Sequence, residues 1–251
     1  MSEPDFDLRC GDCLDPVNGL ASLPDKSADL VVTDPPYAVS NIGLWHYGRP
    51  GKGKRRFDFF DGDADWRAMT ATVLRAARAT LRVMTDQASA YWWCGHREFG
   101  PLVRLFESRG FTTRFLVWAK ANPSPPPPGS GWPSGAELCV YAFRPGRVWT
   151  HDGSHPPPNN VLRHDSFRHG NPGKVAHPTQ KPEGVCAPLI RASSLPGQLV
   201  LDPFAGSGTT GVACIRNGRR FVGWEINSTW HELARKRIAG AREQLEFAAC
   251  R

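Results

Sequence analysis

The chain has 251 residues, of which 40% are hydrophobic and 22% charged, as is ordinary for a soluble globular protein. No apolar run approaches the ~18 residues that a membrane span requires, and the polar start at 1–5 is not a secretory signal. The net charge of +7 favours a polyanionic partner such as nucleic acid, although an arginine-rich composition also follows from a GC-rich genome. We expect a single domain over residues 1–251.

Seven cysteines are scattered along the chain, and this odd, dispersed set suits a reducing compartment. Cys10 and Cys13 form an isolated C-x-x-C pair. A zinc site needs two further ligands at matching spacing, and none stands out. We therefore expect a cytoplasmic protein that uses no metal and no membrane.

Short apolar runs alternate with longer segments of helical periodicity, which is the pattern of stacked βαβ units. Strands are predicted at 6–10, 29–33, 88–93, 112–118, 137–143, 199–201 and 220–224. Helices are predicted at 66–81, 98–108, 182–193, 209–217 and 228–247. Pro182 suits a first helical position, and Ser228 is a candidate N-cap for the last helix. The pattern predicts an α/β fold.

Three segments show neither the periodicity of a strand nor that of a helix. Residues 38–63 contain a basic run at 49–56, residues 119–135 are rich in Pro, Gly and Ser, and residues 144–176 carry several His and Arg side chains. Long irregular segments in a compact domain are usually functional or disordered. We expect them to be loop-rich insertions.

Residues 199–210 read Leu-Val-Leu-Asp-Pro-Phe-Ala-Gly-Ser-Gly-Thr-Thr, which is an apolar strand, a Gly-x-Gly turn and a helix start. Glycine lets a ligand approach the backbone at the carboxyl end of a strand, where α/β folds bind cofactors. Glu225 follows at roughly the ~20-residue spacing of a carboxylate that binds ribose hydroxyls. Val212 stands in place of the third glycine of the dinucleotide fingerprint. The pattern therefore predicts a cofactor that contains a nucleoside, either NAD or S-adenosylmethionine (SAM).

A second strand ends in Asp34-Pro35-Pro36-Tyr37. Two prolines restrict the backbone and remove two donors, which leaves the Asp34 carboxylate and the Pro35 carbonyl as two acceptors for one amino group. Tyr37 adds a planar face on which a base can stack. This combination favours SAM and an exocyclic amine as the methyl acceptor.

Three segments together resemble the signature motifs of the DNA amino-methyltransferases: 34–37, 204–208 and His177-Pro178-Thr179-Gln180-Lys181-Pro182. In that family they are the catalytic motif, the SAM-binding motif and the segment that closes over the methionine part of SAM. Their order resembles that of the β group. The resemblance implies a seven-stranded, mostly parallel, Rossmann-like SAM-dependent methyltransferase fold that is circularly permuted and carries target-recognition insertions at 119–135 and 144–176.

The resemblance also implies roles for single residues. Asp12 matches a contact to the SAM adenine, Glu225 the ribose carboxylate, and Lys181 a partner for the SAM carboxylate. The alternatives are an ordinary turn aspartate at Asp12, a core side chain at Phe204 and a surface lysine at Lys181. The implied catalytic residues are Asp34, Pro35, Pro36 and Tyr37. The implied cofactor-binding residues are Asp12, Cys13, Thr179, Lys181, Phe204, Ala205, Gly206, Gly208, Thr209, Thr210 and Glu225.

The expected activity is methyl transfer from SAM to N6 of adenine in a short duplex DNA site, by base flipping and in-line displacement. N4-cytosine methylation stays open, as do an NAD-binding oxidoreductase and a non-catalytic DNA-binding module. The loop 38–63 is the candidate DNA contact, and a homodimer is compatible with the sequence. The candidate DNA-binding residues are Lys52, Lys54, Arg55 and Arg56.

Overall fold

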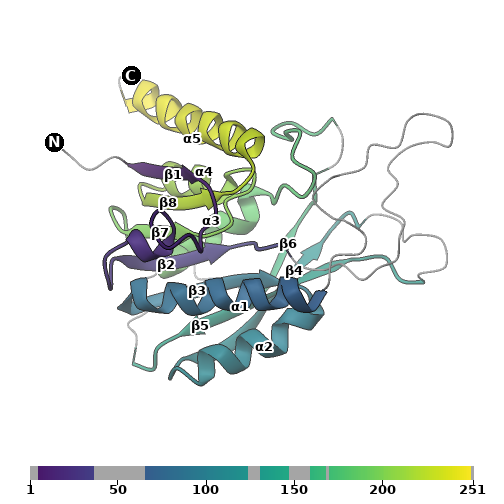
Figure 1. The fold of residues 1–251 in the computed structure, drawn as a ribbon. Helices are drawn as coiled ribbons and strands as arrows, with labels where there is room; N and C mark the ends of the chain where they lie inside the picture. The colour runs from purple at the N-terminus through teal and green to yellow at the C-terminus, as the bar shows by residue number, and fades with distance from the viewer. Residues whose placement is uncertain (1–4, 37–65, 124–130, 147–158, 168–169, 250–251) are drawn as a thin grey trace.

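A computed structural model describes residues 5–36, 66–123, 131–146, 159–167 and 170–249 (Figure 1). The strands are β1 (Phe6–Cys10), β2 (Ala28–Thr33), β3 (Met84–Cys94), β4 (Thr112–Lys120), β5 (Ala136–Phe143), β6 (Val161–His164), β7 (Leu199–Asp202) and β8 (Arg220–Glu225). The helices are η1 (Leu20–Ser22), α1 (Trp66–Val83), α2 (His96–Glu107), α3 (Glu183–Ser193), α4 (Thr209–Arg216) and α5 (Ser228–Ala249). The predicted α/β class is confirmed.

The strands form one sheet in the order β1-β8-β7-β2-β3-β5-β4-β6. The first five strands in this order are parallel to one another, and β5 runs antiparallel to both β3 and β4. The motif-bearing strands β2 and β7 are therefore adjacent, although Thr33 and Asp202 at their ends are 169 residues apart. The mostly parallel methyltransferase-like sheet is as expected, whereas its circular permutation stays a prediction.

The prediction of seven strands was one short. The eighth strand, β6, lies within 144–176, which we expected to be irregular, and it pairs with β4 from Val117↔Val161 to Lys120↔His164. It has four residues and none of them is fully buried. An edge strand of this length lacks the apolar alternation by which a strand is recognised from sequence.

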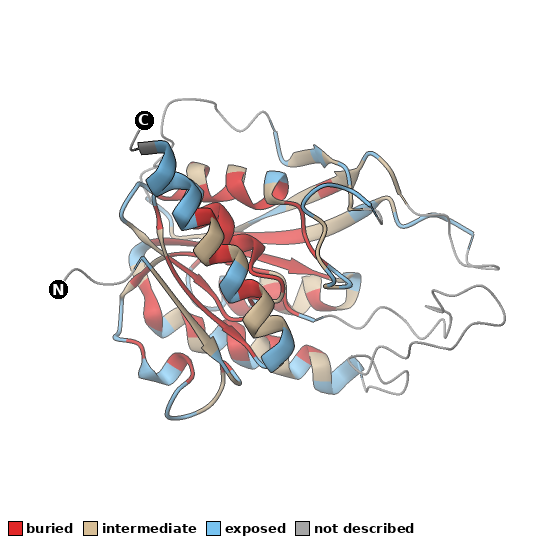
Figure 2. Ribbon diagram, turned by 90° about the horizontal axis from the view of Figure 1, so that it is seen from above, coloured by how far each residue is buried: buried red, intermediate tan, exposed pale blue. Residues whose placement is uncertain are grey.

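Alternate residues of the central strands face two cores, one on each side of the sheet. Val31 of β2 and Trp92 of β3 join a cluster covered by η1, α1 and α2. Val32 and Trp93 belong to a second cluster covered by α3, α4 and α5. Figure 2 shows this buried layer between outer helix faces that are exposed. Such alternation is expected for strands buried on both sides.

Two helix starts differ from the prediction. Pro182 precedes α3 as its N-cap, with extended backbone, rather than being the first helical residue. At α5 the cap is Asn227 and not Ser228: the Asn227 side-chain oxygen accepts hydrogen bonds from the backbone N–H groups of Thr229 (2.9 Å) and Trp230 (3.0 Å). Both asparagine and serine are good N-caps, so composition alone did not separate the two positions.

Among the helices of the described residues, none is long and apolar enough to cross a membrane. The same part of the chain contains no group of three or more His, Cys, Asp and Glu side chains placed to hold a metal ion.

Candidate active site

The candidate site lies at the carboxyl edge of the parallel strands. Asp34 follows β2, the glycine turn follows β7, and Glu225 ends β8, which pairs through Glu225 with Cys10 at the end of β1. Because these four strands are parallel and adjacent, their carboxyl ends meet at one edge of the sheet (Figure 1). Open α/β sheets bind ligands at this edge.

The turn after β7 is built around two left-handed glycines. Gly206 has φ +52° and Gly208, the N-cap of α4, has φ +75°. The backbone N–H of Ala205 donates to the carbonyl of Trp224 at 2.7 Å, which joins the turn to β8. Left-handed backbone is disfavoured for residues with a Cβ, so the predicted Gly-x-Gly turn has a conformational reason.

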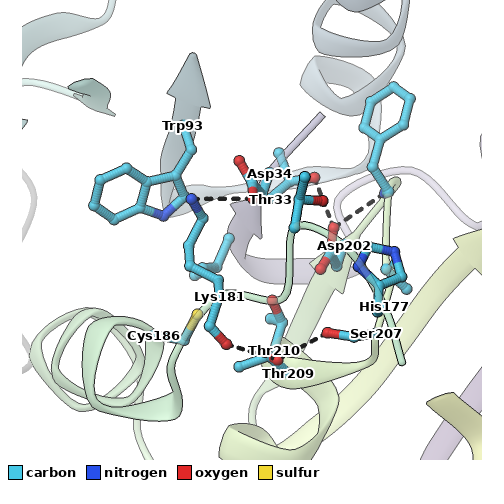
Figure 3. A pocket seen from close by; sticks show the side chains of 15 residues that line it. Thr33, Asp34, Trp93, His177, Lys181, Cys186, Asp202, Ser207, Thr209 and Thr210 are labelled. Atoms are coloured by element: carbon cyan, nitrogen blue, oxygen red, sulfur yellow. Dashed lines mark hydrogen bonds and ion pairs between the residues drawn. The ribbon is translucent and has the colours of Figure 1, made fainter. Parts of the chain in front are cut away.

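A cavity opens beside this turn and collects residues of all three sequence motifs (Figure 3). Seven of the predicted cofactor-binding residues line it: Thr179, Lys181, Phe204, Ala205, Gly206, Thr209 and Thr210. Its other lining residues include Asp34, Trp93, His177 and Asp202. The predicted catalytic and cofactor motifs, which are far apart in the sequence, thus line the same cavity.

Asp34 is placed with its two carboxylate oxygens in different surroundings. Oδ2 lies 3.0 Å from the Lys181 ammonium nitrogen, while Oδ1 is buried and has no hydrogen-bond partner among the described residues. Burial raises the pKa of Asp34 to about 6, against the opposing effect of the Lys181 charge. A buried acceptor without a donor is uncommon, and it marks the place where a ligand donor is required.

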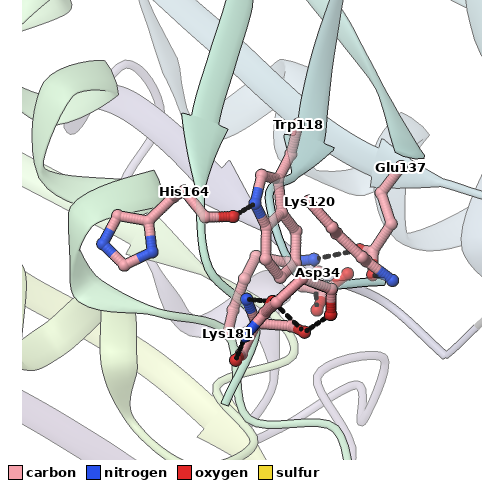
Figure 4. A network of polar contacts seen from close by, with 8 residues as sticks. Asp34, Trp118, Lys120, Glu137, His164 and Lys181 are labelled. Carbon is pink, nitrogen blue, oxygen red and sulfur yellow. Dashed lines mark hydrogen bonds and ion pairs between the residues drawn. The ribbon is translucent and has the colours of Figure 1, made fainter. Parts of the chain in front are cut away.

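Lys181 has two acidic partners, and both belong to the protein (Figure 4). Besides Asp34, its ammonium contacts Oε2 of Glu137 at 2.7 Å, and Oε1 of Glu137 contacts Lys120 at 2.8 Å. Burial alone would raise the pKa of Glu137, but Lys181 and Lys120 hold it down to about 2. The structure thus pairs Lys181 with Asp34 and with Glu137, a contact that the sequence did not predict. The predicted contact of Lys181 with the SAM carboxylate stays a prediction.

Asp202 anchors the glycine turn to β2. Its Oδ1 accepts hydrogen bonds from the Thr33 hydroxyl at 2.6 Å and from the backbone N–H of Phe204 at 3.0 Å. Burial raises the pKa of Asp202 to about 6. The contact holds the strand end that carries Asp34 next to the turn that carries the glycines.

His177 belongs to the third motif but was not singled out in the sequence. Its ring packs edge-on against Trp230 with centroids 4.9 Å apart, and Nδ1 is buried without a partner among the described residues. Burial, together with the charges of Lys174 and Arg237, lowers the pKa of His177 to about 4. The imidazole is therefore neutral at pH 7 and adds no positive charge to the cavity.

The lining of the cavity does not include Asp12, Cys13 or Glu225, which were also predicted to bind the cofactor. The Glu225 carboxylate accepts from the backbone N–H of Asn227 at 2.8 Å, and burial raises its pKa. Asp12 is exposed and its Oδ1 accepts from the backbone N–H of Leu14. Cys13 is different: its thiol is packed in the core, and burial raises its pKa to about 12. Phe204 packs edge-on against Trp92 as well as lining the cavity.

Some of the remaining predicted residues belong to the part of the chain that the structure describes, and others do not. Pro35 is buried and Pro36 exposed at the end of the catalytic motif. Tyr37, Lys52, Lys54, Arg55 and Arg56 lie outside the described residues. Glu137, Lys120 and His177 were missed. A single acid at the start of an otherwise apolar strand was the only signal for Glu137, and such a residue is usually a solvated strand end.

Comparison with known proteins identifies the family to which the chain belongs. The profile of the N6/N4 DNA methylase family matches residues 28–236. The chain belongs to this DNA methylase family. The DNA methylase is 28% identical over 247 residues to the type II methyltransferase M2.DpnII of Streptococcus pneumoniae, covering 89% of this chain and 87% of the relative. The family match supports a methyltransferase over an NAD-binding oxidoreductase or a non-catalytic module.

Solved structures show the same fold at lower identity. The M1.HpyAVI–SAM complex has a TM-score of 0.69 at 22% identity, covering 93% of this chain and 98% of that one. The PvuII DNA methyltransferase, described as cytosine-N4-specific, has a TM-score of 0.71 at 19% identity, covering 95% of this chain and 92% of that one. The DNA methylase thus shares the fold of these methyltransferases, one of which was solved as a complex with SAM.

The residues of the cavity fit SAM. Gly206 borders the cavity without a side chain, His177 forms part of the wall, and the Glu225 carboxylate lies at the neighbouring strand end. Glu225 would hold the ribose, and Thr179 with the glycine turn would hold the methionine part.

Proposed function

We propose that this DNA methylase transfers the methyl group of SAM to the N6 amino group of adenine in a short duplex DNA site. The observation that carries the proposal is the split carboxylate of Asp34, whose Oδ2 is held by Lys181 while the buried Oδ1 has no partner among the described residues. An amino group brought to Oδ1 supplies the donor that this oxygen needs.

The chemistry follows from what the acceptors do to the amine. The adenine amino nitrogen is a poor nucleophile because its lone pair is delocalised into the ring. Hydrogen bonds from its two N–H groups to Asp34 and to the Pro35 carbonyl favour a pyramidal nitrogen with a localised lone pair. SAM, when bound, supplies an electrophilic methyl group on its sulfonium. Alignment in a site that excludes water provides most of the rate, and Asp34 is placed to receive the proton that the methylated nitrogen loses.

Adenine is preferred over cytosine because an aspartate begins the catalytic motif, whereas N4-cytosine enzymes of the resembled family more often carry serine there. The fold does not separate the two bases, since the cytosine-N4-specific PvuII enzyme shares it. Either base presents one amino group to the same two acceptors. The preference therefore rests on Asp34 alone.

Duplex DNA is favoured by the net charge of +7 and by the position of the predicted recognition segments. Segments 119–135 and 144–176 meet beyond β4 and β6: the Asn122 side-chain oxygen accepts from the backbone N–H of Ser166 at 2.7 Å, and its amide donates to the Ser166 carbonyl at 3.0 Å. β4 also carries Lys120, which contacts the Glu137 partner of Lys181. Segment 119–135 thus begins beside Glu137 and the catalytic carboxylate, where a flipped base has to enter.

The test is to incubate the enzyme with SAM and mixed-sequence duplex DNA, digest the DNA to nucleosides and identify the methylated one by mass spectrometry. N6-methyladenine in the wild type, and none with Asp34→Ala, is expected. N4-methylcytosine as the sole product would refute the adenine assignment. Methyl groups found only on RNA or protein, offered in parallel, would refute the DNA substrate.

A further inference from the structure

We propose that Lys181 and Glu137 are positioning residues for the catalytic carboxylate: Glu137 holds the Lys181 ammonium, and Lys181 holds Oδ2 of Asp34 so that Oδ1 alone is presented to the target amine. This inference rests on the proposed function of Asp34. It assigns a role in methyl transfer to Glu137, which belongs to none of the three sequence motifs.

The arrangement is a chain of four alternating charges from four parts of the fold (Figure 4). Lys120 at the end of β4 contacts Oε1 of Glu137 on β5 at 2.8 Å, and Oε2 of Glu137 contacts Lys181, just before α3, at 2.7 Å. Lys181 then reaches Oδ2 of Asp34, after β2, at 3.0 Å. Each oxygen of Glu137 thus has its own cation, whereas Asp34 has one cation on Oδ2 and, among the described residues, no partner for Oδ1.

Lys181 has little freedom to leave this position. Its side chain is 6% exposed, and its ammonium lies 4.7 Å from the ring centre of Trp93 and 5.3 Å from that of Trp118. The Trp118 indole N–H donates to the His164 carbonyl at 2.8 Å, which holds that ring against β6. The backbone carbonyl of Lys181 accepts from the Thr209 hydroxyl at 3.0 Å, which joins it to the start of α4.

This confinement matters because a carboxylate in a cavity can rotate about its Cβ–Cγ bond. An ammonium that is itself fixed by Glu137 and two indole rings selects one rotation of Asp34, in which Oδ2 is occupied. Catalysis by alignment is lost when an acceptor samples other orientations. Breaking a buried pair by removing one partner leaves an uncompensated charge, so loss of Lys181 should affect Asp34 and Glu137 together.

The same geometry sets the charge on Asp34. The charged groups that face Asp34 are Lys181, which lowers its pKa, and Glu137 and Asp202, which raise it. Because Asp34 must be ionised for Oδ1 to accept an amino hydrogen and then the proton that the methylated nitrogen loses, the methylation rate should fall as the pH drops through its pKa. The pH–rate profile should therefore have an acidic limb at the pKa of Asp34. Removing the charge of Lys181 should move this limb to higher pH, and removing the charge of Glu137 should move it to lower pH.

The experiment compares Lys181→Met and Glu137→Gln with wild type, measuring the methylation rate at saturating SAM and DNA between about pH 5 and pH 9. For Lys181→Met we expect at least a tenfold lower kcat, an acidic limb displaced upward by about half a unit or more, and a Kd for SAM within about threefold of wild type. Lys181→Arg should restore part of kcat. For Glu137→Gln we expect the limb to move downward, with a smaller loss of kcat. Lys26→Met removes an exposed lysine that pairs with Asp86 and should change nothing.

A second measurement separates this inference from the proposed function. The carboxyl carbon signal of Asp34, assigned by its loss in Asp34→Asn, is titrated by NMR in the free protein without DNA. Opposite displacements in Lys181→Met and Glu137→Gln support the positioning role even if no DNA product forms, in which case the proposed function alone fails. The inference is overturned if both variants are active and neither the acidic limb of the pH–rate profile nor the titration midpoint of the Asp34 signal is displaced. If Lys181→Met does not fold, Glu137→Gln decides: downward displacement of the acidic limb and of the Asp34 titration supports the inference, and no displacement overturns it.

Discussion

Replacing Gly208 with alanine should destabilise this protein far more than the same change at Gly206, although the two glycines stand in one turn. Both have positive φ, and alanine in that conformation costs about 1–3 kcal/mol. At Gly208 the new Cβ would lie 2.9 Å from Cβ and 3.0 Å from Cα of Ala234 on α5. Backbone cannot yield as a flexible side chain can, so overpacking adds about 1–3 kcal/mol.

The resulting loss of about 2–6 kcal/mol in the free energy of unfolding corresponds to a fall in Tm of roughly 5–20 °C, at about 2–4 °C per kcal/mol for a chain of this size. At Gly206 the nearest atoms to a new Cβ are Nε2 and Cε1 of His177, at 3.4 and 3.5 Å. The ring can shift slightly, so Tm should fall by roughly 2–10 °C from the backbone term alone. Gly206 lines the cavity, and its methyl group should weaken SAM binding about ten- to a hundredfold.

Thermal unfolding without SAM gives the stabilities, and isothermal calorimetry gives the Kd for SAM. Gly240→Ala is the matched control, because Gly240 lies within α5 and its new Cβ would meet nothing within 4 Å; it should stabilise by about 0.5–1 kcal/mol. The reasoning is refuted if Gly208→Ala melts as wild type does, or if Gly206→Ala binds SAM with unchanged affinity.

Four further outcomes are expected. Asp34→Ala should abolish methyl transfer while SAM affinity stays within about threefold, because Asp34 serves the base; turnover within about tenfold of wild type contradicts its role. Glu225→Ala should weaken SAM binding about ten- to a hundredfold through loss of a buried hydrogen-bonded carboxylate, and calorimetry showing an unchanged Kd in a folded variant argues against the ribose contact. Neutralising the four basic residues between 52 and 56 should weaken binding of all DNA sequences and flatten the log–log salt slope by up to ~0.9 for each lost phosphate contact; an unchanged slope means that they do not touch DNA. Burial raises the pKa of Asp202 from 3.8 to about 6, so the stability that its protonation contributes is present below about pH 4 and is lost as the pH rises through 6. Asp202→Asn should therefore gain Tm relative to wild type on going from pH 5 to pH 8, and a difference that is constant over this range rules the effect out.

The elements that sequence predicted best are those whose signal is local. The central strands are buried on both faces and read as short apolar runs, so β2, β7 and β8 were placed to within a residue or two. The Gly-x-Gly turn lies between β7 and α4 as predicted, and both of its glycines have the positive φ that residues with a Cβ seldom adopt. Their contact with SAM stays a prediction. The strand β6 was missed because it is short and only half-buried, and pairing with β4 is what makes it a strand.

The sequence by itself therefore determined the chemistry: a carboxylate and a carbonyl for an amine, a glycine turn for a nucleoside cofactor, and a family in which both occur. Only the tertiary structure decided which charges meet. Asp34, Glu137 and Lys181 come from three separate parts of the chain, and their contacts of 2.7–3.0 Å depend on how β2, β5 and the start of α3 pack. A buried lysine takes whichever carboxylates the packing brings to it, because an unpaired charge there is costly. No local pattern records that choice, and for this reason the contacts of Lys181 with Asp34 and Glu137 were not predicted, while its contact with SAM stays a prediction.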